Sequence, residues 1–169
     1  MADRLAQLLG VLSLGAGDRV RSSVDASLGR AGAHAAALVH LDAYPGDSVR
    51  ALANVLNVSQ PAAVKVVNRL ADAGQLERRP GPDRRTRALH LTANGRAAAA
   101  RVLADRASQL EHVLGTLDRE ERKRLEPLLE KLVSALADDR AGALTVCRMC
   151  DRSTCCAAPG GCPLEHTTA

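Results

Sequence analysis

The stretch that most restricts the fold covers residues 48–92 and reads SVRALANVLNVSQPAAVKVVNRLADAGQLERRPGPDRRTRALHLT. Apolar residues recur at three- and four-residue steps over 49–56, which predicts a short helix. The following NVSQP breaks that helix. Ser59 can cap a second helix, whose first turn tolerates the proline because its missing N–H costs nothing there. This second helix should run to about Ala73, with Gly74 as its C-terminal stop.

The second helix has an apolar and a polar face. We expect its inward positions to be Val64, Val67 and Leu70, and its outward positions to be Lys65, Asn68 and Arg69. A short helix, a turn and a second helix with outward polar side chains form the helix-turn-helix pattern. Such side chains suit contacts with phosphates and base edges, although an ordinary solvated helix face is the alternative interpretation.

Two short strands are predicted over 75–80 and 87–91, around the tip sequence GPDRRT. Arg84, Arg85 and Arg87 place a dense positive charge on this projecting ribbon. Arginine at a loop tip can enter the narrow, electronegative minor groove of DNA. A merely solvated turn is the alternative for these arginines.

Helices are predicted on both sides of this stretch. Upstream, the spacing favours helices over 2–28, with a possible break at Gly15–Gly17, and over 31–43. Downstream, Thr92 can cap a helix to about residue 116, and a capping-box spacing opens another that runs to about Asp138. This last helix contains Pro127, which should kink it. Its apolar stripe comprises Leu125, Leu128, Leu129, Leu132, Val133 and Leu136.

The composition favours a mainly α protein with an aliphatic core. Hydrophobic residues make up 46% of the 169 residues, yet Trp and Phe are absent and Tyr44 is the single aromatic residue. The net charge of +4 permits nucleic-acid binding without establishing it. The sequence shows no signal peptide and no membrane span, so we expect a cytoplasmic protein that does not bind membranes.

The stretch LANVLNVSQPAAVKVVNRLADAGQLERRPGPDRRTRALHLTANGRA resembles the winged-helix core of the MarR family of transcriptional regulators. The residues that carry the resemblance are Leu70, Gly74, Leu76, Arg78, Arg79, Asp83, Arg85, Leu91, Thr92 and Gly95. It implies a winged helix-turn-helix fold, mainly α with a small β-wing, that dimerises through its N- and C-terminal helices. It also implies recognition helices in successive major grooves, with Asp83 bracing the wing and Arg85 reaching the minor groove.

Four segments follow from this organisation. We predict dimerisation and scaffold helices over 1–45, a DNA-binding lobe over 46–92, C-terminal dimerisation helices over 93–140 and a cysteine-rich tail over 141–169. The predicted DNA contacts are Ser59, Gln60, Ala62, Lys65, Asn68, Arg69, Arg84, Arg85 and Arg87.

All five cysteines lie in the last 23 residues, in CRMCDRSTCCAAPGGC. Clustered cysteines in a reducing compartment more often bind metal or sense redox state than form structural disulfides. Four thiolates complete a shell for tetrahedral zinc or for an iron–sulfur cluster. We choose Cys147, Cys150, Cys155 and Cys162 as ligands, with Cys156 as the alternative to Cys155, because neighbours in an extended loop point apart.

The spacing favours an iron–sulfur cluster over zinc. Structural zinc commonly uses two short Cys-x2-Cys elements, and only one is present here. The unequal spacing, the Gly-Gly bend and the final Cys-Pro suit a cluster better. The layout is similar to that of SoxR-type and WhiB-like regulators, which also hold cysteine-ligated clusters. Zinc, a thiol–disulfide switch and cysteines without a role remain alternatives.

The sequence therefore predicts a homodimeric regulator that binds a pseudo-palindromic double-stranded operator, with repression as the expected outcome. A cysteine-ligated centre that senses redox or iron state would tune its affinity. An electron-transfer enzyme is the rival of another class. No glycine-rich phosphate loop or nucleophile–base arrangement supports it, so we predict that the protein is not an enzyme.

Overall fold

The computed structural model describes residues 3–28, 32–81, 87–157 and 161–168. It is helical apart from one two-stranded antiparallel sheet, as the composition and periodicity predict. The elements are α1 (Arg4–Leu28), α2 (Ala33–Ala43), α3 (Val49–Leu56), α4 (Gln60–Asp72), β1 (Leu76–Pro80), β2 (Arg87–Leu91), α5 (Ala93–Leu114), α6 (Arg119–Ser134), α7 (Arg140–Val146), α8 (Arg152–Cys155) and the 3-10 helix η1 (Glu165–Thr168).

Local side-chain chemistry sets the limits of α3 and α4. The Ser48 hydroxyl caps α3 by accepting from the Ala51 amide, and Asn57 ends that helix in the left-handed conformation at φ 51°. The Ser59 hydroxyl caps α4, as predicted. Gly74 follows α4 with φ +66°, a conformation that side-chain-bearing residues rarely adopt. The helix-turn-helix predicted from residues 48–74 is therefore present.

The inward face of α4 differs in register from the prediction. Ala63, Val66, Val67 and Leu70 are buried, whereas Val64 is 38% exposed, so its predicted inward position is wrong. Burial follows the i, i+3, i+4, i+7 positions of one helix face. A strict three-residue step falls short of a full turn and drifts away from that face.

The ribbon of β1 and β2 is attached to the lobe through both strands. Leu76 pairs with Leu91, and Leu89 is completely buried. The loop that follows α2 bonds to β2 as well, because the Gly46 amide donates to Leu89 O at 2.8 Å and the Leu89 amide donates to Asp47 O at 3.0 Å. The end of α2 and the second strand of the ribbon therefore form one hydrogen-bonded unit.

The core is aliphatic and centred on α2. Its completely or nearly buried large side chains come from five elements and the end of α1: Val24, Leu38, Leu41, Leu52, Val67, Leu70, Leu89 and Val102. Alanines of α2 and α5 let these helices approach closely, since Ala35, Ala37, Ala98 and Ala99 are all fully buried. The aliphatic core predicted from the composition is confirmed.

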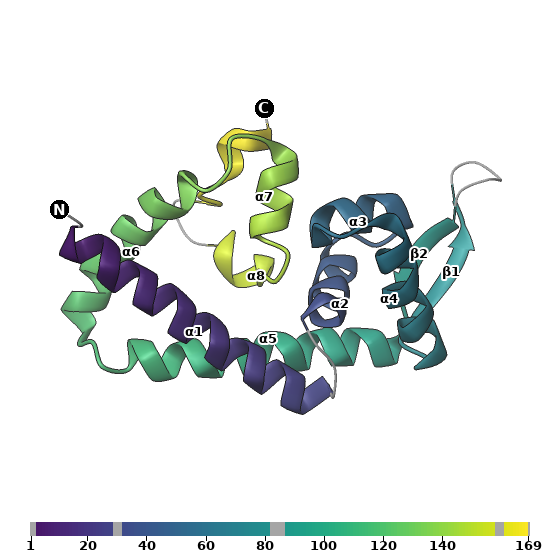
Figure 1. The fold of residues 1–169 in the computed structure, drawn as a ribbon, viewed down its shortest axis with the longest axis horizontal. Coiled ribbons are helices and arrows are strands. Elements are labelled where there is room, and N and C mark those ends of the chain that lie inside the picture. Colours follow the sequence, from purple (N-terminus) through teal and green to yellow (C-terminus); the bar gives the residue numbers. More distant parts are fainter. Residues whose placement is uncertain (1–2, 29–31, 82–86, 158–160, 169) are drawn as a thin grey trace.

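The long helices lie outside this lobe. α1 and α5 pack side by side, and α6 turns back from the far end of α5 (Figure 1). The possible break at Gly15–Gly17 does not occur, because glycine weakens a helix without blocking its hydrogen bonds. Asp118 and Glu121 form the predicted capping box. α6 ends at Ser134, short of the predicted Asp138, and Asp139 instead caps α7.

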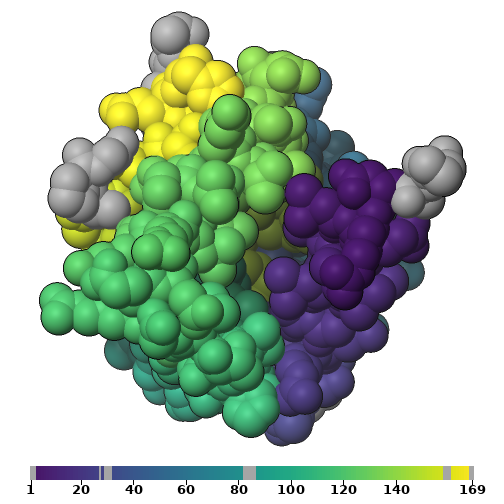
Figure 2. Space-filling model, turned by 90° about the vertical axis from the view of Figure 1, so that its left-hand side faces the viewer, coloured from purple at the N-terminus to yellow at the C-terminus, as the bar shows by residue number. Residues whose placement is uncertain are grey.

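The cysteine-rich tail folds back onto the lobe. α7 packs against α3, and Met149 packs against the buried core residues. A small cluster of Ala137, Ala143 and Leu164 closes the tail on itself. Figure 2 shows α1, α6 and the tail around a hollow on one side of the molecule. In the described parts of the chain, no helix has the length and apolar character needed to span a bilayer.

Candidate nucleic-acid interface and cysteine cluster

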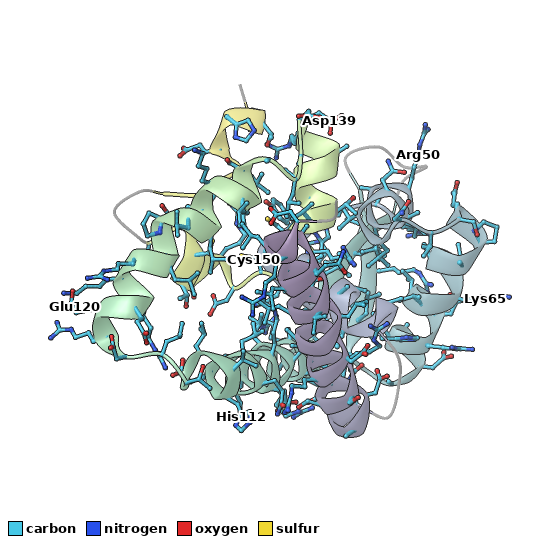
Figure 3. All side chains as sticks on the ribbon, turned by 60° about the vertical axis from the view of Figure 1, so that its left-hand side comes forward. Arg50, Lys65, His112, Glu120, Asp139 and Cys150 are labelled. Carbon is cyan, nitrogen blue, oxygen red and sulfur yellow. The ribbon has the colours of Figure 1, made fainter. Side chains whose placement is uncertain are left out.

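The outer face of α4 carries the predicted polar contacts. Lys65, Asn68 and Arg69 are exposed, and Lys65 points outward from the lobe in Figure 3. Gln60 is also exposed at the start of α4, and Ala62 is partly buried there. The Ser59 hydroxyl already accepts a capping hydrogen bond from the Ala62 amide. Its O–H remains a donor that can reach a phosphate, in keeping with a position at a helix N-terminus.

The recognition face of α4 is tied to the ribbon by a hydrogen bond that the sequence did not reveal. Arg78 of β1 donates to the Asn68 side-chain oxygen at 2.5 Å. Asn68 was predicted as a DNA contact, and in the structure it holds an arginine of the neighbouring strand. Arg79 is engaged differently, because its guanidinium pairs with Glu77. Arg78 thus extends the basic face of α4 onto the ribbon.

Only the base of the predicted wing tip falls in the described part of the chain. Arg87 opens β2, pairs across the ribbon with Pro80, and is exposed. Asp83, Arg84 and Arg85 lie outside the described residues. The exposed cations on α4 and the ribbon form a face suited to backbone phosphates, whose contacts orient a protein on a duplex.

The five cysteines are free thiols and all are partly buried. A chain of hydrogen bonds links three of them, with Cys155 donating to Cys150 and Cys150 donating to Cys147. Cys162 is close enough to interact electrostatically with Cys147 and Cys155. Cys150, labelled in Figure 3, is one of these partly buried thiols. The fold thus gathers the four predicted ligands in one region.

These contacts give the thiols different pKa values. The hydrogen bond from Cys150 lowers the pKa of Cys147, and the same bond together with burial raises the pKa of Cys150. Burial and the neighbouring Cys150 raise the pKa of Cys155 to about 11. Burial also raises the pKa of Cys156. Cys147 is therefore the thiol of this group that ionises most readily, and the thiolate is the form that binds metals.

Cys155 and Cys156 do not lie in the extended loop that the choice between them predicted. Cys155 is the last residue of α8, and Cys156 caps that helix. The Asp151 carboxylate caps the start of this short helix by accepting hydrogen bonds from the amide and the hydroxyl of Thr154. Cys155 joins the thiol chain, while Cys156 lines a cavity of about 320 Å³ together with Cys147 and Cys162.

The donor set fits a soft metal in its chemistry. Four sulfur atoms are the ligands of tetrahedral zinc and of iron–sulfur clusters. Among the described residues, however, no group of three or more His, Cys, Asp or Glu side chains is arranged to hold a metal ion. The thiols are neighbours joined by hydrogen bonds, and their sulfur atoms would have to converge to share one centre.

A second cavity lies between the long helices and the lobe. It has a volume of about 540 Å³ and is lined by aliphatic side chains of α1, α2 and α5 together with Arg21, Arg106 and Arg148. Met149 of the tail forms part of its wall. No aromatic side chain lines this cavity, in keeping with the composition.

Comparison with known proteins agrees with this geometry. A family model described as MarR family matches residues 28–86. A MarR-family protein of Mycobacterium tuberculosis, Rv2887, is 29% identical, with 78% of this chain and 96% of that chain covered and a TM-score of 0.62. Its complex with DNA is 28% identical over 78% of this chain and 98% of that chain, at a TM-score of 0.64. No curated protein gives a significant match.

A more distant structure shows the same fold. MepR, a transcription regulator of the Staphylococcus aureus multidrug efflux pump MepA, is 16% identical, with 78% of this chain and 98% of that chain covered and a TM-score of 0.68. The family-model match is consistent with the observed fold, which combines a winged helix-turn-helix over residues 48–91 with long flanking helices. Residues 28–86 of the chain thus match the MarR family model, and the fold is similar to that of the winged helix-turn-helix structures named above.

Proposed function

We propose that this chain is a transcriptional repressor that binds a pseudo-palindromic operator as a dimer and whose affinity is tuned by a cysteine-ligated centre. The observation that carries the DNA-binding part is the exposed polar face of α4 beside the basic ribbon. Helices of this kind enter the major groove, and ribbons beside them contact the flanking backbone or minor groove. The M. tuberculosis relative crystallised with DNA has the same fold.

The proposed dimer would cover apolar side chains that one protomer leaves in solvent. No residue of α6 is buried, and large apolar side chains are exposed on both α1 and α6. The exposed set is Leu5, Leu8, Leu9, Val11, Leu12 and Leu14 on α1, with Leu128, Leu129 and Leu132 on α6 and Leu136 just beyond it. Pairing of these helices with those of a second copy would remove them from water and fix the spacing of the two recognition helices.

For the centre, we propose an iron–sulfur cluster held by Cys147, Cys150, Cys155 and Cys162. Support comes from the hydrogen-bonded thiols and from the proximity of Cys162. A cluster would supply a redox-sensitive group with a net negative first shell. The alternatives are zinc bound by the same four cysteines and a disulfide formed without any metal. The experiment distinguishes both from a cluster.

The test is analysis of protein purified without oxygen for iron, sulfide and zinc, followed by operator binding with and without the centre. The operator is a duplex selected from a random pool by the protein itself. Stoichiometric iron and sulfide, lost when Cys147, Cys150, Cys155 or Cys162 is changed to Ser and kept in Cys156→Ser, would support the cluster. Stoichiometric zinc would identify the zinc form, and metal-free protein whose affinity responds to oxidation would identify the thiol switch.

Two outcomes would contradict the proposal. Failure to select any duplex would remove the DNA-binding function. An affinity that stays constant on loss of the centre and on oxidation would leave the tail a structural part of a DNA-binding protein, without a sensing role.

A further inference from the structure

The tail touches the lobe through a polar contact centred on Tyr44. Arg152 of α8 donates to the Tyr44 hydroxyl at 2.5 Å, and its guanidinium carbon lies 5.2 Å from the centre of the tyrosine ring. The two residues are 108 positions apart in the sequence. A guanidinium over an aromatic face is attracted by the ring quadrupole, and the hydrogen bond adds direction to that attraction.

Tyr44 leads from this contact into the DNA-binding lobe. Its ring stacks on His40, with centroids 4.9 Å apart and planes inclined by 25°. His40 is almost fully buried, and its Nε2–H donates to the Asp47 carboxylate at 2.8 Å. The Asp47 carbonyl in turn accepts from the Leu89 amide of β2. A continuous set of contacts therefore joins Arg152 in the tail to the second strand of the ribbon.

At its other end, Arg152 lies within the electrostatic reach of the cysteine cluster. Its guanidinium interacts with Cys150, Cys156 and Cys162. Arg152 and Tyr44 both line the 320 Å³ cavity that also contains Cys147, Cys156 and Cys162. They line a second, small cavity of about 20 Å³ as well, together with His40, Cys147 and Cys150. Arg152 and Tyr44 therefore lie between the cysteine cluster and the lobe, where they line both cavities together with the cysteines.

We propose that Arg152 and Tyr44 are positioning residues through which the charge of the cysteine cluster sets the placement of β2, and with it the ribbon that flanks the recognition helix. Neutral thiols leave the guanidinium on Tyr44. A metal bound by several thiolates gives the cluster a net negative charge, which draws the guanidinium toward the sulfurs and weakens its hold on the tyrosine. The tail, the end of α2 and β2 then shift together. This inference rests on the proposed function, since it needs a cluster whose state changes DNA affinity.

The experiment compares two states of the full-length protein. One is reduced and treated with chelator, and the other is loaded with Zn²⁺, which places negative charge on the sulfurs without redox chemistry. The ratio of the two operator affinities is measured for wild type, Tyr44→Phe, Arg152→Gln and Arg152→Lys. Arg148→Gln is the matched control, because Arg148 is an arginine next to the same cysteines and its guanidinium donates to the nearby Thr145 carbonyl instead of to Tyr44.

We expect a wild-type ratio of at least about fivefold, the lower end of ordinary allosteric couplings. Tyr44→Phe and Arg152→Gln should bring the ratio to within about twofold of unity, with metal uptake retained. Arg152→Lys should recover part of the ratio because it restores a cation over the ring, and Arg148→Gln should keep the full ratio. A preserved ratio in both Tyr44→Phe and Arg152→Gln would overturn the inference while leaving the proposed function intact. A wild-type ratio of unity, or no zinc uptake, would overturn the inference, whereas the proposed function stands or falls on the separate iron, sulfide, oxidation and operator-binding measurements.

Hydrogen exchange provides a readout that does not depend on DNA. Zinc loading should change the exchange of the Gly46 and Leu89 amides, which join the loop after α2 to β2. The change should vanish in Tyr44→Phe, even if that variant is somewhat less stable, because each variant is compared with itself in two states. An equal change in Tyr44→Phe would show that the tail acts on β2 by another route and would overturn the inference.

Discussion

At the scale of single residues, Lys65 gives the clearest test of the DNA-binding face. It is exposed on α4 and points away from the lobe. A lysine that neutralises a phosphate releases condensed counterions, so Lys65→Ala should weaken binding to all duplexes and reduce the salt slope of the logarithmic affinity by about one. Lys123→Ala is the control, because Lys123 is exposed on α6 and pairs with Glu120. Titration of labelled duplex at several salt concentrations measures both slopes, and equal slopes for the two variants would contradict the assignment.

The thiols make a second prediction at this scale. Because a hydrogen bond from Cys150 lowers the pKa of Cys147, the Cys147 thiolate persists to lower pH than that of an ordinary cysteine. In reduced, metal-free protein, the alkylation rate of Cys147 should therefore have its midpoint below the usual value of about 8.5, while that of Cys155 lies near 11. Tryptic cleavage after Arg148 and Arg152 places Cys147 and Cys150 on separate peptides for mass spectrometry.

The control for this titration is Cys150→Ala, which removes the donated hydrogen bond. Its Cys147 should titrate at higher pH than in the wild type. A Cys147 midpoint that is the same in both proteins would contradict the role assigned to Cys150.

At the scale of elements, the caps and turns were the readily predictable part of the fold. Ser59, Thr92 and the Asp118–Glu121 box act through neighbours three residues away, so their sequence spacing is sufficient to find them. The error at Val64 has a different origin. Which face of a helix is buried depends on the elements packed against it, and a short apolar run leaves that choice open by about one position.

The junction of α5 and β1 leads to a stability prediction. Gly95 is buried in the first turn of α5, and a Cβ atom there would lie 2.0 Å from the Gln75 carbonyl oxygen. That carbonyl also accepts from the Thr92 amide, so it cannot move freely. Gly95→Ala should lower the free energy of unfolding by about 1–3 kcal/mol, the usual cost of overpacking. Urea unfolding at fixed protein concentration measures this loss, and the exposed neighbour Asn94→Ala should change stability little.

At the scale of the whole molecule, the apolar face of α6 predicts a dimer. Leu132 is 50% exposed in one protomer. Leu132→Glu should weaken self-association and, with it, tight operator binding, since both recognition helices must be engaged together. The neighbouring substitution Lys131→Gln alters an exposed polar residue of the same helix and should leave the dimer unchanged. Sedimentation velocity over a dilution series measures the effect, and a stable monomer that binds the operator tightly would contradict the proposed assembly.

The candidate site was predictable only where its functional residues lie close together in the sequence. Five cysteines within 23 residues mark a reactive tail, and a helix-turn-helix pattern marks the polar face of α4. The docking of that tail was not predictable, because Arg152 reaches a partner 108 residues earlier in the chain and Met149 packs against core residues from several elements of the lobe. His40 and Tyr44 are one helical turn apart, but the hydrogen bond from His40 to Asp47 depends on the turn that follows α2 and has no simple spacing in the sequence.

The nearly aromatic-free core has a practical consequence for spectroscopy. Since the chain contains no Trp and no Phe, its intrinsic fluorescence and its near-ultraviolet circular dichroism come from Tyr44 alone. That tyrosine lies where the tail meets the lobe, beneath the Arg152 guanidinium. The protein therefore carries a built-in, single-site optical reporter of tail docking, and the faint absorbance of one phenol leaves the spectrum open for the bands of any coloured centre.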